Sequence, residues 1–528
     1  MKKLAMLMAE MTIALVGFGA APEPSAGAIV PAAEPLPGVQ AARYEVTDYG
    51  AVCDGITDDT MAVQRAINAA ESAGGGVVEF PGGTCLLNSS HPSRHPWFFY
   101  NLIIGSNVKL LGRPGAKLVQ GPGGRHALVP GAKELRNTVL AFGPDYAEIR
   151  FQQAPVNGGF YKLQGTLADH SSVVLAQPAQ AENFQRGDYV AIYETNQGDV
   201  IPSEVSQIIF VAGATGVLGL KYPLARSFPN PVIAKVTSLV TTNVGMENLI
   251  VQGIEPLAVT ETFGFKALNC QFIINTSVGG SNVTCLNLNT LRNFQFIGNT
   301  FTSAGPSYAA LELTQRNSQD GLFGGNTFIG SSVGFGEYAA HIMLMNNHFH
   351  IHANPSVVAG IFIGGLDVTF TNNEVQGGNI TGGSGWGALL ADFMGPAEYA
   401  SYVGRIRIAH NTFECQADGD TCLGIFGADT SVTGNRITIT GSARGLHVEG
   451  PLIQSNYIVG NQLQMGSGDG LVIVTPASGS GGSVIARNTI SGSGDFGIHL
   501  ATRGAPAAGG ITLSSNLVTG FKVPVSIR

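Results

Sequence analysis

The chain has 528 residues, of which 44% are hydrophobic and 12% are charged, and its formal net charge is −8 at pH 7. This composition excludes an intrinsically disordered chain. The acidic balance argues against nucleic acid as a partner, because such partners require a basic face. No apolar run after the N-terminus is long enough to span a bilayer. The length would allow about three domains of roughly 150 residues, but elongated β folds run longer as one unit.

The N-terminus has the features of a secretory leader. Two lysines precede an apolar stretch at residues 11–21, and small residues at Ala26–Ala28 offer a cleavage site, with Gly19–Ala21 as a second choice. We therefore predict a signal peptide at residues 1–28 and a linker rich in Pro and Ala at 29–42. The protein is expected to be secreted, extracellular or periplasmic. No cysteine lies near the cleavage site, so no membrane anchor is indicated.

Six cysteines allow fifteen disulfide connectivities, and export would permit disulfides to form. No C-x-x-C motif is present, which argues against a zinc ribbon. Pairing between sequence neighbours is the preferred arrangement and predicts three bonds: Cys53–Cys85, Cys270–Cys285 and Cys415–Cys422.

An acidic stretch, "DYGAVCDGITDDT" at residues 48–60, stands out in a chain with few charges. Asp54-Gly55 is a turn dipeptide, and Asp58 or Asp59 precedes an amphipathic helix as its N-terminal cap. Gly74 ends that helix, whose apolar stripe consists of Val63, Ile67 and Ala70. We interpret the acids as a turn and a cap rather than as catalytic groups.

A short phrase of the type "FIGNTF" recurs in the C-terminal half at intervals of 21–38 residues. The residue three before each asparagine and the residue two after it are apolar in every copy. Stacked coils of short strands would bury these columns, so the pattern predicts a parallel β-helix. Asparagine tolerates the left-handed conformation and can share amide hydrogen bonds in a column, so it is expected to mark a tight bend. The anchors are Asn299, Asn326, Asn347, Asn373, Asn411, Asn435, Asn461, Asn488 and Asn516.

The stretch "YEVTDYGAVCDGITDDTMAVQRAINAA", followed by "GGGVVEFPGGTCLL", closely resembles the N-terminal segment of the pectate-lyase superfamily. The superfamily includes polygalacturonase-like hydrolases, alginate epimerases and phage tailspike depolymerases. The resemblance implies an all-β, right-handed parallel β-helix over residues 43–528, with an N-terminal capping helix. Residues 181–230 lack the asparagine phrase and are expected to form a small β insertion.

The resemblance does not extend to a catalytic motif. The polygalacturonase set N-T-D, D-D, G-H-G and R-I-K, the D-P-H-E signature of alginate epimerases and the R-x-P-x-x-R pattern of calcium-dependent pectate lyases are all missing from the coils. No catalytic role can therefore be transferred residue by residue, and the fold alone does not define the reaction.

Two groups of residues on outward positions are candidates for chemistry. His348, His350 and His352 share the outer face of one strand and could hold a metal, but a solvated strand without an ion is the favoured interpretation. In later coils, His447 and His499 lie twelve and eleven residues after their asparagines. They should occupy one column two coils apart, about 9–10 Å along the axis; we call it the histidine column. Glu449, Arg503, Asp392 and Glu312 are expected near it or further along it.

These residues suit an enzyme acting on a uronic-acid-containing glycan. A lyase or epimerase needs a base beside the sugar carboxylate and a cation to hold it, which His447 or His499 with Arg503 could supply. A glycoside hydrolase of the polygalacturonase-like type needs two carboxylates, for which Glu449 and Asp392 are candidates. A non-catalytic carbohydrate-binding or adhesive β-helix is the third hypothesis. We predict an extracellular polysaccharide as partner and no cofactor; calcium is not indicated, and monomer and homotrimer both stay open.

Overall fold

The computed structural model describes most of the chain from residue 42 onward. The residues described are 42–92, 98–126, 136–143, 159–166, 168–194, 203–275, 286–304, 310–330, 332–335, 339–352, 360–380, 389–391, 404–417, 421–425, 429–449, 455–475, 482–502 and 510–527. The predicted signal peptide and nearly all of the predicted linker lie outside them. No helix in these ranges is long and apolar enough to cross a membrane.

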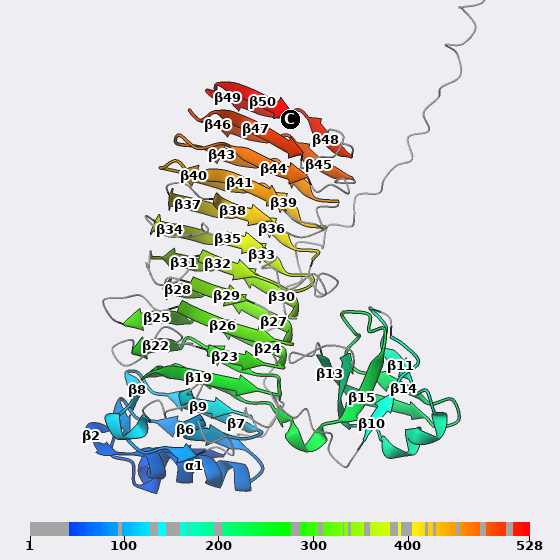
Figure 1. Ribbon diagram of the computed structural model, residues 1–528. Coiled ribbons are helices and arrows are strands. Elements are labelled where there is room, and N and C mark those ends of the chain that lie inside the picture. The colour runs from blue at the N-terminus through cyan, green and yellow to red at the C-terminus, as the bar shows by residue number, and fades with distance from the viewer. Residues whose placement is uncertain are drawn as a thin grey trace, which may run out of the picture. The chain divides into compact units, whose positions relative to one another are not determined.

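The chain forms a right-handed parallel β-helix, as predicted. Three long parallel sheets, here called A, B and C, run from β1 (Arg43–Glu45), β2 (Asp54–Asp58) and β6 (Phe98–Ile104) to the last coil. The short strand β5 (His91–Pro92) pairs antiparallel with β6 at the start of sheet C. Each complete coil contributes one strand to each sheet in that order, and strands of successive coils lie side by side (Figure 1). One coil, for example, consists of β39 (Ser431–Thr433), β40 (Arg436–Ile439) and β41 (Arg444–Glu449).

The strands of the main stack are short and repeat in register. Those of sheet A are β24 (Arg292–Ile297), β27 (Gln319–Gly324), β30 (Ala340–Met345), β33 (Thr369–Thr371), β36 (Arg407–Ala409), β39, β42 (Tyr457–Val459), β45 (Ser483–Ala486) and β48 (Ile511–Ser514). Those of sheet B are β25 (Thr300–Ala304), β28 (Thr327–Gly330), β31 (His348–Ile351), β34 (Glu374–Ile380), β37 (Thr412–Ala417), β40, β43 (Gln462–Gln464), β46 (Thr489–Ser491) and β49 (Leu517–Thr519). Those of sheet C are β26 (Ala310–Arg316), β29 (Ser332–Phe335), β32 (Gly360–Ile363), β35 (Leu389–Ala391), β38 (Thr421–Ile425), β41, β44 (Leu471–Thr475), β47 (Phe496–Thr502) and β50 (Val523–Ile527).

A buried ladder of asparagines joins the coils at the bend between sheets A and B. At Asn373, the backbone N–H and the Nδ2–H both donate to Oδ1 of Asn411, at 2.8 and 3.1 Å. The same Nδ2 donates to the carbonyl of Leu344 at 3.0 Å, while Oδ1 accepts both corresponding bonds from Asn347. This pattern repeats from Asn299 to Asn516, so the predicted sharing of amide hydrogen bonds is confirmed.

The left-handed residue at the bend is not the asparagine of the ladder, as the sequence pattern suggested, but the residue before it. Positive φ occurs at Gly298, Gly325, Asn346, Asn372, His410, Gly434, Gly460, Arg487 and Ser515. The ladder asparagine turns its side chain inward to bond the next coil. The chain therefore reverses direction at the preceding residue, which in most coils is glycine, asparagine or serine and in two coils is His410 or Arg487.

The interior is filled by the apolar columns that the repeat predicts. Phe301, Phe328 and Phe349 stack with ring centroids 4.8 Å apart, which is the spacing of neighbouring strands. Sixteen of the eighteen flanking residues are buried in one core. The other two, Leu513 and Val518 of the last coil, pack against it.

The acids of residues 48–60 have structural roles, as interpreted. Asp54 accepts the backbone N–H groups of Ile56 and Thr57, at 2.8 and 2.7 Å. Helix α1 (Thr60–Ser72) follows and buries Val63, Ile67 and Ala70 in the core. The cap differs in detail: Asp59 occupies the N-cap position, but its carboxylate accepts from the backbone of residues 52 and 53, and Asp58 accepts the N–H of Thr60.

A separate six-stranded sheet interrupts the β-helix. Its strands are β10 (Phe160–Lys162), β15 (Pro231–Lys235), β12 (Tyr189–Glu194), β13 (Ser203–Ala212), β14 (Val217–Leu220) and β11 (Ser172–Val174), in spatial order. All its pairings are antiparallel. The sheet therefore extends beyond the range 181–230 on both sides.

Two of the three predicted disulfides are present, Cys53–Cys85 and Cys415–Cys422. The pairing of Cys270 with Cys285 is wrong for Cys270, which is a free and buried cysteine. Its backbone N–H donates to Oδ1 of Asn299, so Cys270 occupies the ladder position one coil earlier and faces the interior. Burial raises the pKa of its thiol to about 12. Cys285 lies outside the described residues.

One buried carboxyl group has no compensating charge in the part of the chain that the structure describes. Glu261, between β19 (Glu255–Thr260) and β20 (Thr262–Phe263), is 6% exposed, and its Oε2 has no hydrogen-bond partner in that part. Burial raises its pKa from 4.5 to about 8. The folded chain therefore holds a proton at Glu261 that the unfolded chain would release at lower pH.

Replacing one ladder asparagine should weaken the fold. Asn373→Ala leaves donors and acceptors of both neighbouring coils unpaired, so we expect a loss of about 2–3 kcal/mol in a urea titration. The matched control is Asn372→Gly, at an exposed position whose φ of 54° glycine adopts readily. Equal midpoints for the two variants would contradict the role of the ladder.

Glu261 should make stability depend on pH. Its folded pKa of about 8 lies above the ordinary 4.5, so its contribution is complete below about pH 4.5 and is lost as pH rises toward 8. The thermal midpoint of Glu261→Gln should therefore fall less than that of the unmodified chain between about pH 5 and about pH 9. Parallel curves for both proteins would show that Glu261 carries no such linkage.

Candidate functional site

The histidine column lies on the outer face of sheet C. His447 of β41 pairs with Gly424 of β38 on one side and Val472 of β44 on the other, and Val472 pairs with His499 of β47. The two histidines therefore share one column two coils apart, as predicted, which places their backbones about 9–10 Å from each other. Leu446 and Val448 belong to the core, so His447 points to the opposite face.

His447 is held between two charged side chains of its own strand. Its Nδ1 lies 3.2 Å from Nη1 of Arg444, and its Nε2 lies 2.9 Å from Oε2 of Glu449. A guanidinium can only donate, so Nδ1 accepts and Nε2–H donates to the carboxylate. The neutral ring thus has a defined tautomer, and both its nitrogens are engaged.

Burial divides the roles within this group. The side chain of His447 is 5% exposed although it faces outward, whereas that of Glu449 is 25% exposed and Arg444 is exposed. The sequence interpretation treated His447 as an accessible base; the structure corrects this, because the imidazole is covered. The groups that can meet a ligand are the carboxylate and the guanidinium. Arg444 was missed, although it lies three residues before His447.

His499 lies two coils after His447 in the column and is partly exposed. Its ring packs against Phe496, with centroids 4.5 Å apart. Its Nδ1 is buried and has no hydrogen-bond partner among the described residues. This nitrogen is therefore fixed in place by packing rather than by a polar contact.

The remaining predicted residues are only partly placed. Arg503 and Asp392 lie outside the described residues. The backbone of Glu312 pairs with Gly334, and the pairing continues through Phe362, Leu390 and Gly424 to His447. Glu312 therefore belongs to the same column, five coils before His447.

The three histidines of "NHFHIH" lie on sheet B, a different face. His348 Nδ1 contacts Oε2 of Glu374 in the next coil at 3.0 Å, and His350 Nδ1 contacts Oε1 of Gln376 at 3.0 Å. The contact of His348 with Glu374 was not predicted from the sequence. Glu374 and Gln376 lie as many residues after their ladder asparagine as His348 and His350 lie after theirs. This equal spacing could have predicted both contacts from the sequence.

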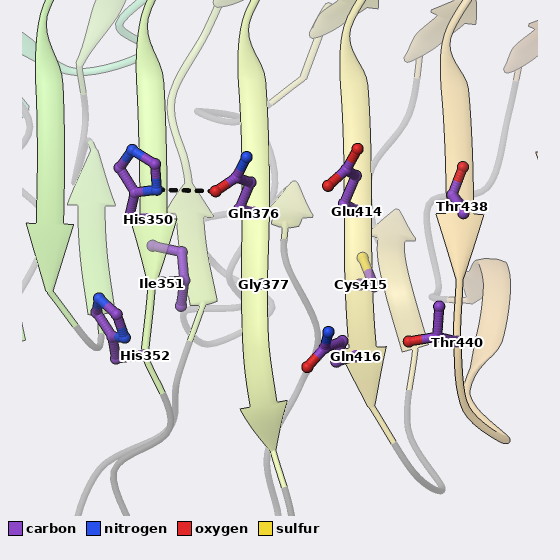
Figure 2. A pocket seen from close by; sticks show the side chains of 10 residues that line it. All are labelled: His350, Ile351, His352, Gln376, Gly377, Glu414, Cys415, Gln416, Thr438 and Thr440. Atoms are coloured by element: carbon purple, nitrogen blue, oxygen red, sulfur yellow. Dashed lines mark hydrogen bonds between the residues drawn. The ribbon is translucent and has the colours of Figure 1, made fainter.

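His350 and His352 line a cavity of about 520 Å³ that crosses four strands of sheet B (Figure 2). Its other polar lining residues are Gln376, Glu414, Gln416, Thr438 and Thr440. Burial and the neighbouring His350 lower the pKa of His352. We call this cavity the sheet B groove.

The histidines do not converge on a metal position. Within the described ranges, three ligand atoms close enough to share one ion occur only at Cys53, Asp59 and Cys85, where the two thiols form a disulfide.

Comparison with known proteins places the N-terminal segment in a recognised group. Residues 44–121 match the family described as "Rhamnogalacturonase A/epimerase, pectate lyase-like", which confirms the resemblance seen in the sequence. The chain is 42% identical over 69 residues to the mannuronan C5-epimerase AlgE1 of Azotobacter vinelandii. It is 45% identical over 70 residues to alginate lyase 7 of the same organism.

These matches are short: each covers 13% of this chain and 5% or 8% of the relative's own length. Among solved structures, the adhesin PfbA of Streptococcus pneumoniae is similar over 90% of this chain and 91% of its own, with 14% identity and a TM-score of 0.49.

Proposed function

We propose that this chain modifies a uronic-acid-containing polysaccharide by removing the proton beside the sugar carboxylate, as a lyase or an epimerase. The observation that carries the proposal is the contact of His447 with both Arg444 and Glu449 on the outer face of sheet C. The matches to a mannuronan epimerase and an alginate lyase support this class of substrate, although they cover the N-terminal segment alone.

Each residue of the group has a role in this scheme. Arg444, which is exposed, pairs with the sugar carboxylate and stabilises the negative charge that develops there. Glu449 takes the C5 proton, and the electron pair of that C–H bond moves toward the carboxylate. His447 is a positioning residue, because its Nε2–H fixes one oxygen of Glu449.

The intermediate can continue in two ways. In a lyase, the C4–O bond breaks, a C4=C5 double bond forms and the departing oxygen takes a proton. In an epimerase, a proton returns to C5 from the opposite face and no bond of the polymer breaks. His499, about 9–10 Å along the column, is suited to contact the neighbouring sugar unit. Arg503 stays in the proposal as a second cation.

A hydrolase of the polygalacturonase-like type is the alternative, and it depends on Asp392 as a second carboxylate beside Glu449. A non-catalytic binding or adhesive role is the other alternative. The lyase or epimerase scheme is preferred because Arg444, His447 and Glu449 already form one connected group.

The proposal includes secretion. It is supported by the predicted signal peptide and by two disulfides, which persist in oxidising compartments.

The decisive variant is Glu449→Gln, which keeps the shape of the side chain but cannot accept the proton. We expect activity on polyuronates to fall by about a hundredfold or more, measured as absorbance of the unsaturated product and as C5 configuration by NMR. Glu247→Gln is the matched control, since that carboxylate is 29% exposed on sheet A.

The competing functions give other results in the same assays. Release of reducing ends without absorbance, lost in Asp392→Asn, would establish the hydrolase. Unchanged activity in Glu449→Gln would refute the assignment of this site. No change in absorbance, C5 configuration or reducing ends across a broad glycan panel would favour a binding protein.

A further inference from the structure

The sheet B groove lies on a face of the β-helix separate from the histidine column. It crosses β31, β34, β37 and β40, three coil spacings or about 14 Å in length. Its volume of about 520 Å³ falls within the range of about 300–1,000 Å³ usual for ligand pockets. No reaction proposed above uses it.

The end of the groove at β31 and β34 is held rigid by a chain of hydrogen bonds. Gln376 Oε1 accepts from His350 Nδ1–H, and Gln376 Nε2–H donates to Glu374 at 3.0 Å. Because an amide oxygen can only accept, His350 must carry its proton on Nδ1. Its Nε2 is then an acceptor, and no described residue bonds to it. The tautomer is therefore set before a ligand arrives.

The other end, at β37 and β40, carries polar groups without partners among the described residues. Glu414 and Gln416 of β37 are exposed, and their side chains bond to no described residue. The hydroxyls of Thr438 and Thr440, at the last strand of the groove in Figure 2, are likewise unpaired within the described ranges. This end thus offers carboxylate and amide acceptors together with amide and hydroxyl donors.

Two structural features shape the backbone beneath the groove. The register of β34 against β37 shifts between Gly377 and Ile380, which marks a β-bulge opposite the second half of β37. Bulges are frequent beside functional sites because they redirect the strand. Cys415, beneath the groove, is tied by its disulfide to Cys422 of β38. The disulfide therefore restrains the backbone of β37 next to Glu414 and Gln416, whose polar groups are available to a ligand.

The charges of the groove select against an anionic ligand. Glu414 lines it, and Glu374 lies behind Gln376, whereas no lysine or arginine is among the lining residues. A uronate carboxylate placed here would meet a like charge without a compensating cation. Sugar hydroxyls both donate and accept, and they match a wall of carboxylate, amide, hydroxyl and imidazole groups.

We propose that the sheet B groove is a binding site for a neutral oligosaccharide, distinct from the proposed polyuronate site on sheet C. Glu414 and Gln416 bind sugar hydroxyls at one end of the groove, and His350 Nε2 accepts from a sugar hydroxyl two coils away. The site would hold the protein on a neutral glycan while sheet C meets an acidic one. The inference does not depend on the reaction proposed for Glu449.

The test is isothermal titration of the full chain with neutral oligomers of glucose, mannose and galactose. We expect one of these series to bind, and the double variant Glu414→Ala/Gln416→Ala to weaken that binding at least about tenfold, as for hydrogen bonds to a charged group. Gln462→Ala is the matched control. Gln462 is exposed on sheet B two coils after Glu414 and lies outside the groove, so this substitution should leave the affinity for the oligosaccharide unchanged. Both sites are exposed, so thermal midpoints should stay level.

Other outcomes would overturn the inference. Absence of binding by every neutral series would do so, and so would undiminished binding by the double variant. A third such result is uronate binding that persists in Glu449→Gln but disappears when Glu414→Ala is added. None of these results bears on the activity assays of Glu449, so failure of this site and failure of the reaction are distinguishable.

Discussion

The hydrogen bonds between stacked asparagines fix the register on which the outer surface depends. Each ladder asparagine binds the next through one shared acceptor oxygen, and its amide also closes the bend of the coil before. Burial makes these bonds hard to replace, because an unpaired amide in the core would remain unsatisfied. The loops between coils can therefore differ in length, from 21 to 38 residues between anchors, without shifting one strand against the next.

Fixed register turns sequence offset into position in space. On sheet B, residues at equal distance from their asparagine stack into columns, and on sheet C the distance varies by one, as at His447 and His499. Two such columns carry chemistry on separate faces. On sheet C, His447 and His499 share a column through Val472, and Arg444 and Glu449 flank the first of them. On sheet B, His350, Gln376 and Glu414 lie side by side in three successive coils and line the groove. The first arrangement joins a base to a cation, and the second collects neutral donors and acceptors around one carboxylate.

The repeat allowed much of this to be predicted. Counting from the anchors placed the apolar core and brought His447 and His499 into one column. The same count would have paired His348 with Glu374 and His350 with Gln376, had it been applied to sheet B. Other features could not be predicted from these distances along the sequence. The burial of His447 and its contact with Arg444 depend on how side chains pack on the outer face. The left-handed conformation occurs at the residue before each asparagine, because the asparagine side chain turns inward to bond the next coil. Cys270 was misassigned because it stands at a ladder position without being an asparagine.

The central claim is that an acidic polysaccharide lies across sheet C at Arg444 and Glu449. The most direct measurement is a crystal structure of Glu449→Gln with a bound uronate oligosaccharide. The account predicts a sugar carboxylate paired with Arg444, C5 facing residue 449 and the adjoining sugar unit near His499. An oligosaccharide bound elsewhere on the β-helix, with sheet C unoccupied, would contradict it.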